Sequence, residues 1–174
     1  MHLRVGDTWY FLVSFLDAYS RFIVHWELLP TMKKEDISLA LLAALEKFPG
    51  TAPEIVSDRG CQYTSKEFHK LVAKFELNHI LCRVAHPQSN GTIERYHRST
   101  REALAGNPPH NLSKARQLIG EWVEEYNETR LHAGLKYIEP AEYFRGDPQR
   151  RMETRRKKLE DARANRLATN ARMR

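Results

Sequence analysis

Apolar residues in the first part of the chain predict three consecutive strands. Residues 8–17 read Thr-Trp-Tyr-Phe-Leu-Val-Ser-Phe-Leu-Asp, a nearly continuous apolar run that is typical of a strand buried on both faces. Gly6-Asp7 before it predicts a hairpin turn from a short strand at residues 2–5. A turn at residues 18–21 leads into a third strand at residues 22–28, so we expect these strands to form a meander.

Helices should alternate with short strands in the next part of the chain. Apolar residues at helical spacing predict a helix through residues 37–48, which Pro49-Gly50 would end. The further expected elements are a strand at 54–57, a helix opened by a Thr64–Glu67 capping box, a strand at 78–82, a helix with the apolar stripe Ile93, Tyr96, Thr100, Ala103 and Leu104, and a helix capped by Ser113. This order predicts an α/β domain with a mixed five-stranded sheet flanked by helices.

Composition limits the class of protein. A chain of 174 residues that is 41% hydrophobic can build a single domain with a real core. It has neither an apolar run long enough to span a membrane nor a signal peptide, so we expect a cytoplasmic protein without a membrane partner. Only Cys61 and Cys82 are present, which fits a reducing compartment.

The net charge of +6 is concentrated at one end of the chain. Residues 147–174 hold ten basic and four acidic residues, whereas residues 1–146 hold eighteen of each. We therefore expect a core at 1–146 and a basic tail at 147–174, either a solvated helix or a disordered segment. Such a tail could simply face water or could bind a phosphate backbone.

Two acidic residues stand where catalytic carboxylates could be held rigidly. Asp58 follows a short apolar run and precedes Arg59-Gly60, which predicts a strand end. Glu94 lies off the apolar stripe of its helix, on a face that continues through Arg98 and Arg101. Carboxylates on two rigid elements can share a hard divalent cation, and phosphodiester chemistry often uses such cations.

Each acid also has an ordinary explanation. An Asp before Arg-Gly is commonly a turn residue, and a Glu near a helix start interacts favourably with the helix dipole. Asp17, at the end of the long apolar run, is most simply a turn residue that bonds nearby backbone. The 35 residues between Asp58 and Glu94 decide nothing by themselves, because the chain has 22 acidic residues.

Four motifs in order make the chain similar to the DDE-type integrase catalytic cores of bacterial insertion-sequence transposases and retroviral integrases. They are Leu16-Asp-Ala-Tyr-Ser-Arg-Phe-Ile-Val24, Val56-Ser-Asp-Arg-Gly-Cys-Gln-Tyr-Thr-Ser65, His86-Pro-Gln-Ser-Asn-Gly-Thr-Ile-Glu-Arg95, and Tyr126-Asn-Glu-Thr-Arg-Leu-His-Ala-Gly-Leu135 with Glu139-Pro140. The resemblance implies a ribonuclease-H-like fold, with Asp58 and Glu94 as catalytic residues that bind Mg²⁺ or Mn²⁺. It also implies DNA as a partner, self-association, and a structural role for His132.

The resemblance makes residues 83–91 an active-site loop that touches DNA, which adds Gln88 and Asn90 as DNA-binding candidates. Arg95, Arg98 and Arg101 could position phosphates, a role that carries no sequence information. The alternatives are a solvated connection and a solvated cationic helix face.

The chain departs from the family pattern at its start. The family's first Asp lies on the strand before the hairpin, upstream of Met1, and neither Asp7 nor Asp17 occupies that position. We expect an N-terminally truncated core whose metal affinity and strand transfer are weak. Two hypotheses follow: a core that cleaves phosphodiesters and transfers DNA strands, or an inactive fragment that folds and binds DNA or an intact transposase.

Overall fold

A computed structural model describes residues 1–82 and 91–172 of the chain, with side chains up to residue 170. Strands β1 (His2–Val5), β2 (Thr8–Leu16) and β3 (Ile23–Leu29) form an antiparallel sheet in the order β1-β2-β3, which confirms the meander. Gly6 adopts φ +56° at the hairpin, and its N–H donates to Pro109 O at 3.0 Å. A Cβ at Gly6 would lie 2.9 Å from His110 O, so this turn requires glycine.

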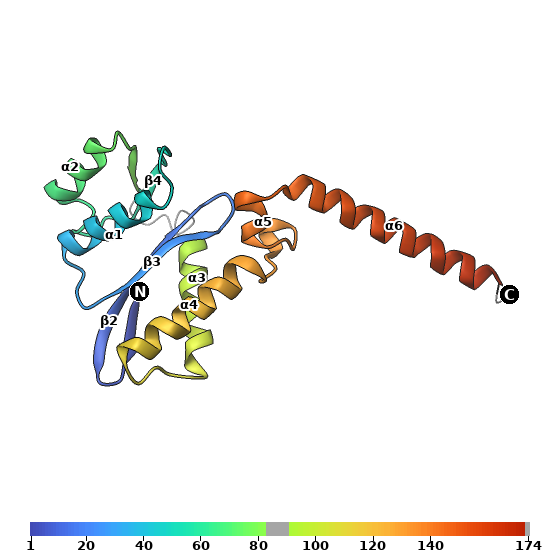
Figure 1. Ribbon diagram of the computed structural model, residues 1–174, viewed down its shortest axis with the longest axis horizontal. Helices are drawn as coiled ribbons and strands as arrows, with labels where there is room; N and C mark the ends of the chain where they lie inside the picture. The colour runs from blue at the N-terminus through green and yellow to red at the C-terminus, as the bar shows by residue number, and fades with distance from the viewer. Residues whose placement is uncertain (83–90, 173–174) are drawn as a thin grey trace.

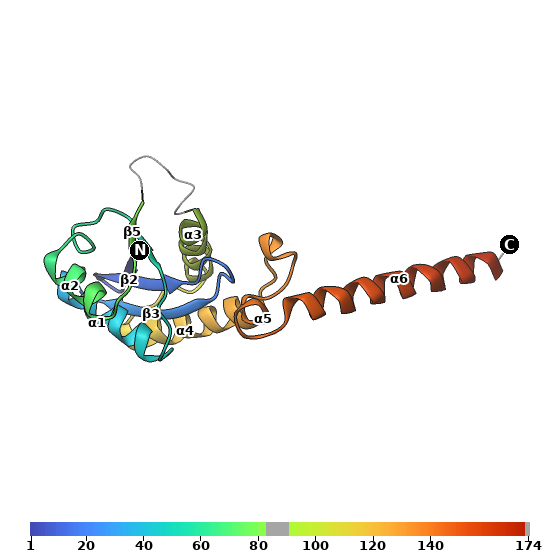
Figure 2. The same ribbon diagram turned by 90° about the horizontal axis from the view of Figure 1, so that it is seen from above.

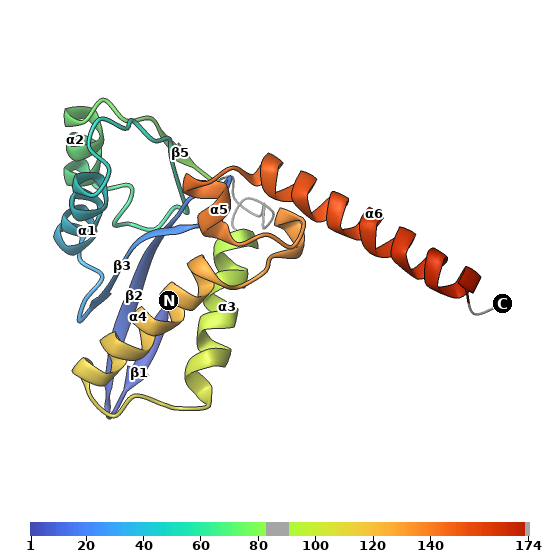
Figure 3. The same cartoon turned by 45° about the vertical axis from the view of Figure 1, so that its right-hand side comes forward.

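The sheet lies between two layers of helices (Figures 1 and 3). Helices α1 (Lys34–Glu46) and α2 (Lys66–Lys74) cover one face, while α3 (Gly91–Ala105) and α4 (Leu112–Glu128) cover the other. Each face of the sheet has its own hydrophobic core, and successive residues of β2 point into different ones. Leu12 packs with the α3–α4 layer, and Val13 packs with the α1–α2 layer. Burial on both faces is thus confirmed for the middle of β2, whereas Trp9 near the hairpin is 59% exposed.

The remaining strands, β4 (Ile55–Ser57) and β5 (His79–Leu81), form a separate parallel pair. All five expected strands are present, but among the described residues they divide into sheets of three and two. Pairing between the first strand segment and β2 ends at Met1 and Leu12, whose backbones exchange two hydrogen bonds of 2.7 and 2.8 Å. After Leu12, no described strand pairs with this side of β2, and so none joins β2 to the β4–β5 pair.

Two helix caps differ from the sequence-based expectations. The N-cap of α2 is Ser65 and not Thr64: the Ser65 hydroxyl accepts from Phe68 N at 3.2 Å, whereas the Thr64 hydroxyl is directed at backbone carbonyls. The N-cap of α4 is Asn111 and not Ser113, and its Oδ1 accepts from Lys114 N at 2.8 Å. In both helices the capping residue has an extended backbone, which directs its side chain at the open N–H groups.

The C-terminal part of the chain is more helical than expected. A short 3₁₀ helix, η2 (Ala133–Leu135), and α5 (Pro140–Arg145) follow α4, and α6 (Pro148–Arg172) ends the described chain. Figures 1 and 2 show α6 extending away from the body as a rod. The tail is thus a helix in this structure, and among the described helices none is long and apolar enough to cross a membrane.

Candidate active site

Asp58 lies directly after β4, where the chain leaves the two-stranded sheet. Its side chain is exposed, and its Oδ1 accepts a hydrogen bond from Gly60 N at 2.9 Å. This turn orients the carboxylate and occupies one oxygen, which leaves Oδ2 available to a ligand. The position at an exposed strand end agrees with the sequence-based expectation.

Hydrogen bonds to β5 hold this strand end in place. Ser57 Oγ donates to Asp58 O at 2.9 Å and lies 2.9 Å from His79 Nε2. Cys82 N donates to Ser57 O at 2.8 Å, and Arg59 Nε donates to Cys82 O at 3.1 Å. The backbone before Asp58 and the side chain after it are therefore both bonded to the segment of β5 and Cys82.

Glu94 lies in the first turn of α3 and is exposed. The buried stripe of this helix is Tyr96, Thr100 and Leu104, while Ala103, which we expected to be buried, is exposed. The buried residues of α3 follow one another at a spacing of four. Ala103 directly precedes Leu104 in the sequence, so its side chain points about 100° away from that of Leu104 around the helix.

Polar contacts fix the rotation of α3 about its own axis. Trp122 Nε1 donates to Thr100 Oγ1 at 2.9 Å, and Thr100 Oγ1 donates to Tyr96 O at 2.9 Å. Ser14 Oγ donates to Tyr96 Oη at 3.3 Å. With the buried side anchored to α4 and β2, Glu94 must point away from the core.

The amino group of Met1 connects the strand end with α3 electrostatically. Burial lowers the pKa of this amino group, Arg101 lowers it further, and Asp58 opposes both effects. The pKa of His97 falls to about 4, first because of burial and then because of the positive charges of the Met1 amino group and Arg101. The Met1 amino group thus lies within electrostatic range of both Asp58 and Arg101.

His97 was not among the sequence-based candidates. Its Nε2 is buried and makes no hydrogen bond to any described residue. The spacing Glu94-Arg-Tyr-His97 places the two side chains one helical turn apart, and this could have drawn attention to the histidine.

The structure separates the three candidate arginines of α3. Arg101 lies on the Met1 side, whereas Arg95 lies within electrostatic range of Tyr126 on α4. Burial raises the pKa of Tyr126 to about 12, and Arg95 is among the cations that act against this rise. Arg98 is exposed on the face of Glu94. The other two DNA-binding candidates, Gln88 and Asn90, lie outside the described residues.

Two other polar residues of the motifs have structural surroundings. Asp17 Oδ2 accepts from Ser20 N at 2.7 Å and from Ser20 Oγ at 2.5 Å, so this carboxylate stabilises a turn. The His132 ring packs edge-on against Tyr126 at 4.7 Å between centroids, and burial lowers the pKa of His132 to about 4. These contacts agree with the structural roles expected for both residues.

Asp58 and Glu94 have the chemistry that a hard divalent cation requires. Both carboxylates are exposed, and Mg²⁺ commonly binds one or two protein carboxylates together with water and substrate phosphates. Within residues 1–82 and 91–172, no group of three or more His, Cys, Asp and Glu side chains lies together as a metal site. The described residues thus supply no complete set of metal ligands by themselves.

Comparison with known proteins shows the family of the chain. The integrase core domain family matches residues 1–87 and, in a second match, residues 76–140. An insertion element IS136 protein of Agrobacterium fabrum is 30% identical over 142 residues, which cover 77% of this chain and 73% of that protein. Transposase InsF for insertion sequence IS3A of Escherichia coli is 25% identical over 147 residues; they cover 82% of this chain and half of InsF.

A solved structure supports the fold. The integrase catalytic core domain of HTLV-2, solved in complex with magnesium, superposes with a TM-score of 0.66 at 17% identity, covering 82% of this chain and 90% of that one. The fold is accordingly the ribonuclease-H-like fold of retroviral integrase cores. The family matches, together with a 30% identical relative of which the chain covers 73%, show that the chain belongs to the integrase core domain family.

Proposed function

We propose that this chain is the catalytic core of a transposase that cleaves DNA phosphodiesters and transfers the strands. The observation that carries the proposal is the position of Asp58 in a chain of the integrase core family: an exposed carboxylate at a hydrogen-bonded strand end. A function in transposition is supported by the similarity to transposase InsF, of which the chain spans half.

In this proposal Asp58 and Glu94 hold Mg²⁺ or Mn²⁺. A bound cation of this kind polarises the phosphodiester and lowers the pKa of a water molecule that attacks it. The bond from Gly60 N fixes the orientation of the Asp58 carboxylate, and the anchored rotation of α3 presents Glu94 to solvent. Arg98 and Arg101, on the same face as Glu94, would hold DNA phosphates beside the two acids.

DNA and a second copy of the chain are the proposed partners. The HTLV-2 core has been solved in trimeric and dimeric forms, which supports self-association of a chain with the same fold. We place the protein in the cytoplasm, and the exposed thiol of Cys61, which forms no disulfide in the described part of the chain, is consistent with a reducing compartment.

One observation favours a second candidate function. Within residues 1–82 and 91–172, no three His, Cys, Asp or Glu side chains lie together as a metal site, so the described residues supply at most two carboxylates to a cation. A protein with this arrangement could fold and bind DNA or an intact transposase without cleaving DNA.

Nicking of supercoiled plasmid DNA in Mn²⁺ distinguishes the two functions. We expect Asp58→Asn and Glu94→Gln to abolish nicking, because each removes a metal ligand, whereas the control Glu102→Gln on an exposed position of α3 should retain it. Binding to the same DNA in EDTA should be unchanged in all variants. Nicking that survives both substitutions would refute the proposed site, and DNA binding without nicking in any variant would favour the second function.

A further inference from the structure

Within the described residues, the contacts of helix α6 with the body lie near its first turns. Arg151 lies 3.8 Å from the Glu139 carboxylate, Arg155 donates to Lys136 O at 2.9 Å, and the Arg155 guanidinium lies 6.0 Å from the ring centre of Tyr137. From residue 153 to residue 170 every described side chain is exposed. A helix of 25 residues is about 37 Å long, so most of α6 projects into solvent, as Figure 2 shows.

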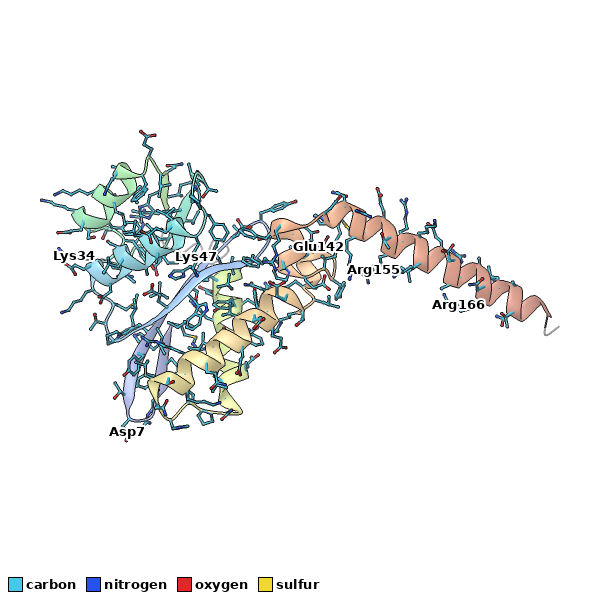
Figure 4. The ribbon with its side chains drawn as sticks, viewed as in Figure 1. Asp7, Lys34, Lys47, Glu142, Arg155 and Arg166 are labelled. Carbon is cyan, nitrogen blue, oxygen red and sulfur yellow. The ribbon has the colours of Figure 1, made fainter. Side chains whose placement is uncertain are left out.

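The charged residues of α6 are sorted by helix face. At 3.6 residues per turn, six basic side chains share less than half of the circumference. We call this the basic face; it consists of Arg151, Arg155, Arg156, Lys158, Arg163 and Arg166. The three acids Glu153, Glu160 and Asp161 lie on the opposite side, together with Arg150 and Lys157. Figure 4 shows Arg155 and Arg166 along the same edge of the helix.

The outer part of the basic face has unpaired cations. Among the described residues, Lys158, Arg163 and Arg166 form no ion pair or side-chain hydrogen bond, and Arg156 has only a 3.8 Å contact with Glu160. Arg155 and Arg166 are eleven residues apart, which places them roughly 16 Å from each other along the helix axis. The face is therefore a row of free positive charges that starts at the body and points away from it.

We propose that the basic face of α6 binds the sugar-phosphate backbone of duplex DNA without reading its sequence. The proposal rests on the proposed function only for the choice of DNA as the polyanion. Arginine and lysine side chains neutralise phosphates and release counterions, which makes such binding strongly dependent on salt. Leu159 and Leu167 are the large apolar side chains in the outer part of α6, and they point in different directions, so the helix has no continuous apolar stripe for a lipid surface or a packed partner helix.

Two double variants with equal charge test this assignment. Lys158→Gln/Arg166→Gln removes two cations from the basic face, and Arg150→Gln/Lys157→Gln removes two from the acidic side. All four side chains are exposed, so circular dichroism should show the same folded core in both variants. Affinity for a fluorescent duplex of mixed sequence is measured by anisotropy in EDTA from 50 to 300 mM KCl.

The basic-face variant should bind DNA several-fold more weakly, and its slope of log K against log salt should be smaller by about 2, since each phosphate contact contributes about 0.9. The control variant should keep a slope close to that of the unchanged chain. An equal loss of DNA affinity in both variants would show that only net charge matters, which would overturn the proposal. Unchanged DNA binding in both variants would show that α6 does not contact DNA, which would overturn it as well. Because no metal is present, the outcome is independent of nicking activity, and an Asp58→Asn chain should show the same slope as the unchanged chain.

Discussion

Asn127 is the buried polar residue that joins α4 to the start of β3. It is 5% exposed, its Oδ1 accepts from Ile23 N at 2.8 Å, and its Nδ2 donates to Ile23 O at 3.1 Å. Both backbone groups of Ile23 are thereby satisfied by one amide side chain in a place where water cannot replace it.

Replacing this residue should destabilise the domain strongly. We expect Asn127→Ala to lower the free energy of unfolding by about 2–4 kcal/mol, since it leaves a buried N–H and a buried C=O without partners. Urea unfolding measures the loss, with Asn107→Ala at an exposed position as the control. A loss no larger than that of the control would contradict the structural role of Asn127.

His97 should make stability depend on pH. Its pKa is about 4 in the folded chain against an ordinary value of 6.5, so between these values the unfolded chain binds more protons than the folded one. The contribution of His97 to the free energy of unfolding should therefore be fully present above pH 6.5 and should be lost as the pH is lowered from 6.5 towards 4. We expect His97→Gln to reduce this dependence in urea unfolding at several pH values and to leave the part due to His132, whereas substitution of the exposed His110 by Gln serves as the control.

At the scale of single elements, the N-cap of α2 can be tested by neighbouring substitutions. Ser65→Ala should lower the free energy of unfolding by about 1 kcal/mol, because the hydroxyl that accepts from Phe68 N is lost. Thr64→Ala should cost less, because the Thr64 hydroxyl only makes contacts of 3.4 Å to carbonyls. A larger loss for Thr64→Ala would instead support the capping box that the sequence suggests.

The periodicity of the sequence was sufficient to predict the strands and the helices up to α4, but neither their exact ends nor η2 and α5. The run at residues 8–17 and the stripe through Tyr96 and Thr100 have strong hydrophobic signals, and both elements were confirmed. Caps were misplaced because Thr64 and Ser65 are both good N-cap residues, and only the backbone angles decide between them. The pairing of β4 could not be predicted from a three-residue strand, because its neighbours are set by tertiary packing.

The candidate site was predictable at the level of position. The sequence indicated that Asp58 follows a strand and that Glu94 begins a helix, and both positions were confirmed. The hydrogen bonds beside Asp58 were not predictable, because Ser57 and Arg59 meet His79 and Cys82 only through the pairing of β4 with β5. Whether Asp58 and Glu94 act in catalysis stays a prediction.

At the scale of the whole molecule, α6 should be dispensable for the stability of the core. Its described polar contacts with the body are the partly exposed ion pair Arg151–Glu139 and the contacts of Arg155, and ion pairs open to solvent contribute about 0–1 kcal/mol each. A chain ending at residue 147 should keep a free energy of unfolding within about 1 kcal/mol of that of the whole chain. A chain that fails to fold after this deletion would contradict the division into a core and a tail, which otherwise stays a prediction.

The central claim is that Asp58 and Glu94 form a site for a divalent cation, and titration calorimetry with Mn²⁺ tests it most directly. The unchanged chain and the Glu102→Gln control should both bind Mn²⁺, whereas Asp58→Asn and Glu94→Gln should each lose most of the binding, since a hard cation would keep only one carboxylate. Mn²⁺ binding that is unaffected by both substitutions, or that is absent from the unchanged chain, would contradict the account.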